Sequence, residues 1–284
     1  MRVDPISYSA KSVVDTLGMP IYRLFGRRPF SVGYFSSRWK AIKKAIDQNV
    51  VQPGKELPVE FGVGFDERVV EYPWFFGRLR HDGSAKGRIL DAGSTLNFDA
   101  VLDRSPLKGA DITIVTLAPE KRCYWHEGYS YVFGDLRSTT LGSGVFDTIV
   151  SISTIEHIGL DNTLLYTSDT DRAEADEKGF VAAIQEFRRM IKPGGNCYIT
   201  FPYGKHRNHK WYQVFDQSMV DRVVEVFRPS AFEAEYFAYA RNGWRRAAAE
   251  EVKEATTYDV HSGEGWSDDR AASSRAIACL HLVA

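Results

Sequence analysis

The sequence predicts an α/β fold, in which helices cover both faces of a doubly wound and mostly parallel sheet. Short apolar runs rich in Ile and Val recur from residue 87 onward, and continuous runs of this kind are typical of strands buried on both faces. A helical segment with one apolar stripe separates two of these runs. Strands that alternate with helices along the chain indicate a parallel sheet.

Six apolar runs are the candidate strands. Each is short, and most are followed by polar or turn-forming residues. The sixth run is expected to close the sheet. In chain order the runs are 88–93, 111–117, 131–135, 146–153, 196–202 and 275–283.

The predicted helix lies between the fourth and fifth runs. Its apolar side chains form one stripe, while charged side chains occupy the other positions. Pro193 and the two glycines after it stop the helix. The stripe consists of Phe180, Ala183, Ile184, Phe187 and Ile191.

The aromatic-rich section before the first run is expected to be a helical extension. Trp39, Ile42 and Ile46 recur at helical spacing, with lysines on the other side. A turn-rich polar stretch, HDGSAKG, separates this section from the apolar runs. We therefore expect an N-terminal helical extension or lid, 1–85, and a sheet domain, 86–284.

The charges indicate neither a nucleic-acid nor a membrane partner. The 36 basic and 37 acidic residues nearly cancel, so no strong field attracts polyanions. The N-terminal stretch MRVDPISYSAKSVVDTLG lacks the long apolar run of a signal peptide or membrane span. Cys123, Cys197 and Cys279 are odd in number and far apart, which favours a reducing cytoplasm over a disulfide framework.

The residues that follow each run are the candidate binding residues, because ligands of doubly wound sheets bind beyond the carboxyl ends of the strands. A site assembled from five loops is therefore predicted. The loops are 91–97, 116–120, 134–135, 151–157 and 202–209.

The order of these motifs resembles that of class I S-adenosylmethionine-dependent methyltransferases. The matching stretches are LDAGS, GD, FDTIVSISTIEHI and IKPGGNCYITFP, within about residues 87–204, and 275–283 is similar to that family's closing strand. The resemblance implies a Rossmann-like fold, S-adenosylmethionine as the cofactor, and methyl transfer. A narrower similarity, carried by FDERVVEYPWFFGRL, STIEHIGL and FPYGK, is to methyltransferase-like proteins of bacterial surface-glycan biosynthesis. It implies O-methylation of a sugar, glycan or small molecule.

The resemblance implies that the loop after the first strand holds the methionine part of the cofactor. Asp91 would organise this loop and the cofactor's amino group, and Gly93 would let the main chain approach closely. The loop has one glycine where a dinucleotide-binding loop has three. Hydroxyl and amide groups from Ser94, Thr95 and Asn97 stand in the same loop.

The ends of the second and third strands supply the other cofactor contacts that the resemblance implies. The family usually has an acid for the ribose after the second strand, but Thr116 stands there and Glu120 is the nearest carboxylate. A hydroxyl lacks the charge-assisted strength of a carboxylate. Asp135 would accept a hydrogen bond from the adenine amino group, with Leu136 beside the ring. Alternatively, Asp135 caps a helix.

Two further groups of residues are expected to bind the cofactor. Ser153 ends the fourth run. Glu67, Tyr72 and Trp74 are expected to lie over the cofactor as a lid. The alternative is that this aromatic cluster is core between the extension and the sheet.

Methyl transfer to a hydroxyl requires a base. His157 is the first candidate, because its loop faces the methyl group in the resembled family, and His206 and His209 are the second choice. The alternatives are a structural role for His157 and a solvated basic loop for the other two. The three imidazoles could suit a divalent ion, but no carboxylate spacing supports one, so no metal is predicted.

Other classes of function stay open. A nicotinamide-dependent oxidoreductase would need further glycines after Gly93 and an acid after the second run. A non-catalytic binding or scaffold protein of glycan assembly fits Thr116 and the glycine-poor loop better. An RNA methyltransferase is disfavoured by the balanced charge. The acceptor and the oligomeric state, including a homo-oligomer, are left open.

Overall fold

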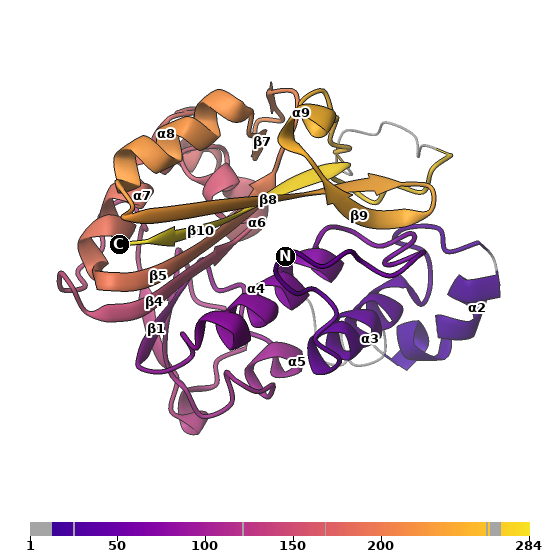
Figure 1. Cartoon of the computed structure of the whole chain (residues 1–284), viewed down its shortest axis with the longest axis horizontal. Coiled ribbons are helices and arrows are strands. Elements are labelled where there is room, and N and C mark those ends of the chain that lie inside the picture. The colour runs from indigo at the N-terminus through magenta and orange to yellow at the C-terminus, as the bar shows by residue number, and fades with distance from the viewer. Residues whose placement is uncertain (1–12, 25, 121, 168, 260, 262–267) are drawn as a thin grey trace.

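The computed structural model describes residues 13–24, 26–120, 122–167, 169–259, 261 and 268–284. Its central feature is an eight-stranded sheet with the order β3-β2-β1-β4-β5-β10-β8-β9 (Figure 1). The strands of this sheet are β1 (Arg88–Ala92), β2 (Asp111–Thr116), β3 (Ser130–Phe133), β4 (Phe146–Ile152), β5 (Ile191–Pro202), β8 (Ala231–Ala240), β9 (Gly243–Ala247) and β10 (Ala276–Val283). A separate two-stranded sheet consists of β6 (Arg207–Asn208) and β7 (Gln213–Val214).

Most of the sheet is parallel. β1 pairs in parallel with β2 and β4, β2 with β3, and β4 with β5. β10 lies antiparallel between β5 and β8, and β9 is antiparallel to β8. This topology confirms the predicted doubly wound, mostly parallel, Rossmann-like sheet with a closing C-terminal strand.

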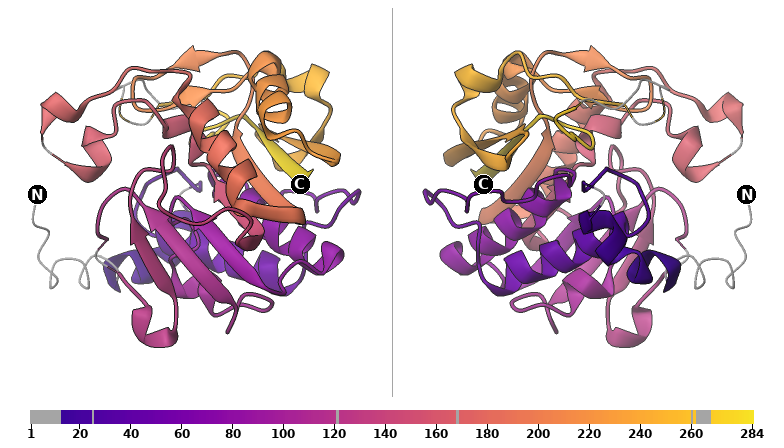
Figure 2. Two further views of the ribbon diagram at one scale, coloured as in Figure 1. Left: turned by 90° about the vertical axis from the view of Figure 1, so that its left-hand side faces the viewer. Right: turned by 90° about the vertical axis from the view of Figure 1, so that its right-hand side faces the viewer.

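Helices cover both faces of the sheet (Figures 1 and 2). α3 (Tyr34–Asp47) and α4 (Arg68–Asp82) lie on one face, and α7 (Gly179–Met190) and α8 (Gln217–Phe227) lie on the other. In β1, Ile89 packs in the core with α3 and α4, whereas Leu90 packs in the core with α7 and α8. The strand is therefore apolar without alternation. Shorter helices are α2 (Met19–Leu24), α5 (Asp99–Leu102), α6 (Thr163–Tyr166) and α9 (Ala249–Val252).

The N-terminal section shares one core with the sheet. Trp74 and Phe75 of α4 contact the ring of Tyr198 on β5, with ring centroids 6.0 and 5.6 Å apart. Ile42 and Ile46 of α3 are fully buried in the same core, so the helical stripe predicted there is confirmed. The described residues of α3 and α4 thus share one hydrophobic core with the sheet, and the domain division at residue 85 stays a prediction.

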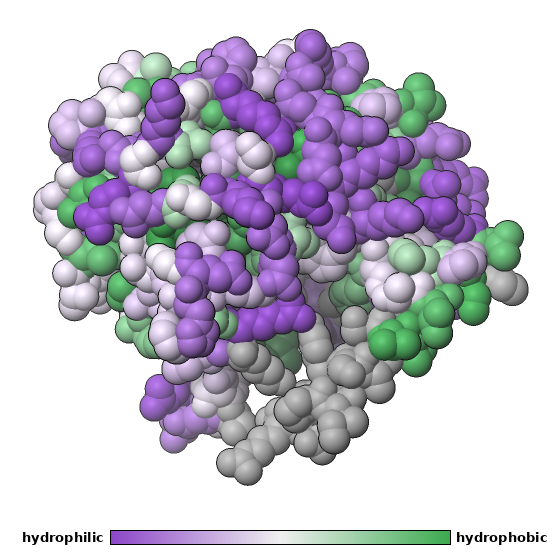
Figure 3. Space-filling model, turned by 90° about the horizontal axis from the view of Figure 1, so that it is seen from below, coloured by the Kyte–Doolittle hydropathy of each residue, from purple (hydrophilic) through white to green (hydrophobic). Residues whose placement is uncertain are grey.

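The surface is hydrophilic over much of the face seen from below (Figure 3). Apolar side chains gather at the right-hand side of that view, where α2 lies. Ile21 and Leu24 of α2 are exposed, as is Leu17 just before it. No helix among the described residues is long and apolar enough to cross a membrane.

The predicted runs correspond to β1–β5 and β10, and the predicted helix is α7. β8, β9 and α8 have no counterpart in the prediction. The expected alternation is also incomplete, because residues 134–145, between β3 and β4, form no helix.

Candidate functional site

A cavity lies at the carboxyl ends of β1, β2, β3 and β4. Gly93 follows β1, Thr116 ends β2, Asp135 follows β3, and Thr154 and His157 follow β4; all five line the cavity. The strand order places these ends side by side, which is where doubly wound sheets bind their ligands. The cavity volume is about 100 Å³.

Asp91 fixes the loop after β1. Its buried carboxylate accepts hydrogen bonds from the main-chain N–H groups of Thr95 (3.1 Å) and Leu96 (2.8 Å), and from the Thr95 hydroxyl (3.3 Å). Burial raises the pKa of Asp91 to about 7, against these hydrogen bonds, which lower it. Asp91 thus organises the loop, and its contact with a cofactor stays a prediction.

Glycine is required at position 93 because the main chain there lies close to the Thr154 side chain. Its φ is 119°, and a Cβ atom there would lie 2.2 Å from Oγ1 of Thr154. Ser94 follows with a φ of 60°. Its buried hydroxyl has no hydrogen-bond partner among the described residues. Ser94 does not line the cavity, and its contact with a cofactor stays a prediction.

Glu120 stands beside Thr116 at the end of β2. The Thr116 hydroxyl donates to Glu120 Oε1 (3.1 Å), and the Asn97 amide donates to Glu120 Oε2 (2.9 Å). Asn97 in turn accepts from the Tyr131 hydroxyl (2.8 Å). A carboxylate on an exposed side chain therefore stands beside Thr116. Its contact with a cofactor ribose stays a prediction.

Asp135 is already paired. Arg137 Nη2 lies 2.6 Å from Asp135 Oδ2 and 2.8 Å from Glu174 Oε1. Burial raises the pKa of Asp135, but the hydrogen bonds from Arg137 outweigh it and hold the pKa below its ordinary value. Leu136 is buried and also lines the cavity. The contact of Asp135 and Leu136 with adenine stays a prediction.

His157 presents a neutral imidazole to the cavity. Its Nδ1 lies 2.8 Å from the main-chain oxygen of Trp211. Because a carbonyl oxygen can only accept, Nδ1 carries the hydrogen and Nε2 is left as an acceptor. Burial lowers the pKa of His157 to about 4. The side chain is 21% exposed, so a ligand in the cavity can reach it.

His206 and His209 lie outside this cavity. Nδ1 of His206 is 2.9 Å from the Val214 main-chain oxygen. His209 is buried and stacks on Tyr212 at 4.5 Å. Among the described residues, no three His, Cys, Asp or Glu side chains are arranged to hold a metal ion, so the three histidines do not form a metal site together.

Two of the three predicted lid residues, Tyr72 and Trp74, have different positions. The Tyr72 hydroxyl donates to the main-chain oxygen of Thr95 (2.6 Å), which places Tyr72 against the loop after β1. Trp74 is 1% exposed and donates to Glu235 of β8 (2.8 Å). The lid prediction is wrong for Trp74, which is core, because its indole lies between α4 and the sheet.

Ser153 also turns away from the cavity. Its hydroxyl donates to Glu71 Oε1 (2.6 Å), and the Thr200 hydroxyl donates to the same oxygen (2.7 Å). Ser153 therefore holds α4 on the sheet, which corrects its assignment to the cofactor.

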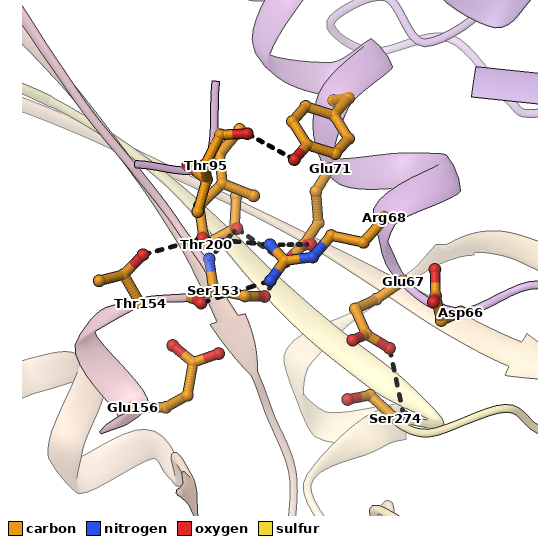
Figure 4. Close-up of polar contacts among 12 residues, drawn as sticks. Asp66, Glu67, Arg68, Glu71, Thr95, Ser153, Thr154, Glu156, Thr200 and Ser274 are labelled. Carbon is orange, nitrogen blue, oxygen red and sulfur yellow. Dashed lines mark hydrogen bonds and ion pairs between the residues drawn. The ribbon is translucent and has the colours of Figure 1, made fainter. Parts of the chain in front are cut away.

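A charged cluster around Arg68 was not predicted from the sequence (Figure 4). Glu71 is fully buried, and Arg68 Nη1 lies 3.3 Å from its Oε2. Glu156, in the turn after β4, is 2% exposed. One signal was present: Glu71 interrupts the apolar helical stretch VVEYPWFF, and charged side chains are buried only at a high cost unless they are paired.

Solved structures that are similar to this chain include methyltransferases, and the similarity is low. A 1,6-didemethyltoxoflavin N1-methyltransferase from Burkholderia thailandensis, solved with S-adenosylhomocysteine, is 12% identical, with a TM-score of 0.45 over 100% of this chain and 91% of that one. A SAM-dependent methyltransferase from Archaeoglobus fulgidus is 14% identical, with a TM-score of 0.44 over 72% of this chain and 91% of that one. No protein-family model and no curated protein matches the sequence. The fold assignment therefore rests on the strand order and pairing described above.

Proposed function

We propose that this protein transfers a methyl group from S-adenosylmethionine to a small-molecule acceptor. The observation that carries the proposal is the cavity formed where β1, β2, β3 and β4 end side by side. The motif order of the sequence supports the same cofactor. S-Adenosylmethionine supplies an electrophilic methyl group on a positively charged sulfur.

The residues around the cavity fit this cofactor. Thr116 and Glu120 offer a hydroxyl and a carboxylate for ribose hydroxyl groups. Asp135 and Leu136 offer an acceptor and an apolar surface for adenine. The loop held by Asp91 carries the buried, unbonded hydroxyl of Ser94, which suits the polar methionine end.

We further propose a hydroxyl of a sugar, glycan or other small molecule as the methylated group, with His157 as the base. The neutral imidazole would take the hydroxyl proton at Nε2 while Nδ1 donates to Trp211. The free cysteines Cys123, Cys197 and Cys279 support a reducing compartment such as the cytoplasm. A homo-oligomer stays a prediction that only a measurement of mass in solution would test.

A second candidate is a non-catalytic binding protein built on the same fold. Arg137 is ion-paired with the Asp135 carboxylate. The cavity of about 100 Å³ is also smaller than typical ligand pockets, which have volumes of roughly 300–1,000 Å³. Cofactor binding in catalysis would therefore require Arg137 to move. A scaffold protein would have no such requirement.

Calorimetry with S-adenosylmethionine and S-adenosylhomocysteine tests the proposal. We expect both to bind the parent protein, and a turnover screen with sugar nucleotides, glycans and phenols to identify an acceptor. Asp103→Ala, an exposed change outside the cavity, should leave the affinity unchanged. No heat at millimolar ligand would overturn methyl transfer and favour the scaffold.

A further inference from the structure

A partly buried acidic cluster lies next to the cavity, at the N-terminus of α4. Figure 4 shows Glu67 and Arg68 at the start of α4, Glu71 one turn later, and Glu156 in the turn after β4. The carboxylates of Glu67 and Glu156 lie on either side of a space that Arg68 faces. We call these four residues the acidic cluster.

The positive charge of Arg68 is shared within the cluster. Its guanidinium lies 3.3 Å from Glu71 and donates to the main-chain oxygens of Ile152 (3.1 Å) and Ser153 (3.5 Å). The positive charge of Arg68 and the negative charge of Glu71 thus offset one another. Glu67, which is half-buried, and Glu156, which is buried, remain as two acidic groups. An uncompensated negative charge is unfavourable where water is largely excluded.

Several buried polar atoms beside these two carboxylates have no hydrogen bond within the described part of the chain. They are Glu156 Oε2, the Tyr212 hydroxyl and the Ser274 hydroxyl. The side chain of Ser274 points into the space between Glu67 and Glu156 (Figure 4). The Tyr212 hydroxyl feels the negative charges of Asp259, Glu67 and Glu156, which Arg207 partly offsets. Buried polar atoms are nearly always hydrogen-bonded, so this convergence indicates a site for a hydrogen-bond donor.

The acidic cluster adjoins the candidate cofactor cavity. Glu156 Oε1 lies 3.9 Å from Nε2 of His157, which lines the cavity. Arg68 is 24% exposed, so the cluster is not sealed from solvent. A group held by Glu156 would therefore lie near a ligand of the cavity.

We propose that the acidic cluster binds a protonated amine of the acceptor, so that the acceptor is a small molecule with a basic nitrogen. This inference rests on the proposed function. An ammonium group has three N–H donors and no acceptor, which matches the carboxylates of Glu67 and Glu156 and the hydroxyl oxygens of Ser274 and Tyr212. A neutral sugar would provide hydroxyl donors but no positive charge to offset the two carboxylates.

Binding of a cation would also change the protonation of Glu67 and Glu156. Burial raises the pKa of Glu67 to about 8, and it raises that of Glu156 well above its ordinary value. A bound cation would favour the ionised carboxylates and lower both pKa values. Binding of an amine at pH 7 should therefore release protons into the buffer.

The test uses pairs of probes that differ in charge. Methylammonium and protonated glucosamine are titrated into the full-length protein with S-adenosylhomocysteine present, and methanol and glucose serve as neutral counterparts. We expect the cations to bind at millimolar concentration or better, and the neutral probes at least about tenfold more weakly. The heat should vary with the ionisation enthalpy of the buffer, as proton release requires.

Variants identify the groups that bind. Glu156→Gln and, separately, Glu67→Gln should weaken the cationic probes by about 10- to 100-fold and leave S-adenosylhomocysteine unchanged. If one variant does not fold, the other decides. Glu127→Gln, an exposed change away from the cluster, is the matched control.

Three results would overturn the inference. The cations could bind no better than the neutral probes, the Gln variants could bind them as the parent does, or the variants could weaken S-adenosylhomocysteine equally. The last result would assign the cluster to the cofactor. If the parent bound glucosamine but not S-adenosylhomocysteine, the proposed function would fail while the amine site stood.

Discussion

Arg137 and Asp135 form an ion pair at the end of β3, with Nη2 2.6 Å from Oδ2. The same guanidinium also binds Glu174, 37 residues further along the chain. All three side chains line the candidate cofactor cavity. The acid expected to meet adenine is thus held by an internal cation, and that cation competes with any ligand for it.

Asp135→Ala should weaken S-adenosylhomocysteine by about 1–3 kcal/mol, roughly 5- to 150-fold, because a buried hydrogen bond is lost. Arg137→Ala should instead strengthen it by about 3- to 10-fold, because Asp135 is released. Calorimetry on both variants measures these changes. In the double variant, the gain from Arg137→Ala should vanish. A gain that persists without Asp135 would show that Arg137 only restricts space.

Gly93→Ala should destabilise the protein and disturb the loop after β1. The φ of 119° is unfavourable for any side chain, and the new Cβ would displace Thr154. We expect a cost of about 2–4 kcal/mol in the free energy of unfolding, and weaker binding of S-adenosylhomocysteine. Denaturant unfolding and calorimetry measure the two effects.

Gly109→Ala is the control for backbone strain. Gly109 also has a positive φ, 76°, but a Cβ there would meet nothing within 4 Å. Gly109→Ala should lower the free energy of unfolding by only about 1 kcal/mol. Equal costs at the two positions would show that Thr154 moves aside freely.

The parts of the fold that the sequence predicted well are those with local, continuous signals. β1, β2, β4, β5 and β10 are apolar because both faces are covered, and α7 has one clear stripe. The edge strand β3 is apolar although none of its residues is buried. β8 was missed because its first residues are exposed and only Phe237, Ala238 and Tyr239 are buried. Its stability depends on pairing with β10, which lies far along the chain.

The candidate site was predictable where its residues follow strand ends. Thr116 and Glu120 meet because they are four residues apart, and Asp91 bonds to a loop four residues on. The acidic cluster could not be predicted in this way. Glu71 depends on Thr200, 129 residues away, and no local pattern reports such a contact.

His157→Ala should reduce turnover by about 10²- to 10⁴-fold if His157 is the base. S-Adenosylhomocysteine should bind the variant nearly as it binds the parent. The matched control is His206→Ala, which lies outside the cavity and should keep its rate. Loss of thermal stability without loss of rate in the folded fraction would make His157 structural.

The pH profile adds an independent check on His157. The imidazole must be neutral to accept a proton, and burial lowers its pKa to about 4. The rate controlled by His157 should therefore rise as pH increases through about 4 and be flat from pH 6 to 8. A rise centred near neutrality would point to another group.

Glu235→Ala should be among the most damaging changes in the core. Glu235 accepts hydrogen bonds from Trp74 and Arg78 and is paired with Arg246, and its side chain is 11% exposed. Without Glu235, the Arg78 side chain, which is 3% exposed, loses its buried partner. We expect the free energy of unfolding to fall by about 3–5 kcal/mol. Glu233 also binds Arg78 but is 63% exposed, so Glu233→Ala should cost about 1 kcal/mol or less. Denaturant unfolding compares the two, and similar costs would contradict a buried network.

The buried carboxyl groups should make stability fall as pH rises. The pKa of Glu67 is raised from 4.5 to about 8 in the folded protein, chiefly by burial and then by Asp66 and Glu71. An acid with a raised folded pKa contributes its full stability below the unfolded pKa and loses it as pH rises through the folded value. For Glu67 this window runs from about 4.5 to 8, and for Asp91 from about 3.8 to 7.

Glu67→Gln removes one of these groups and keeps its shape. The variant should unfold at nearly the parent's temperature at pH 5, and at a higher temperature than the parent at pH 8, because only the parent then carries the extra buried charge. Each kcal/mol corresponds to roughly 2–4 °C for a chain of this size. Thermal unfolding at pH 5, 6.5 and 8 measures the difference, with Glu127→Gln as the exposed control. Parallel curves for Glu67→Gln and the parent would mean that Glu67 is ionised in the fold at pH 5 already, stabilised by Arg68.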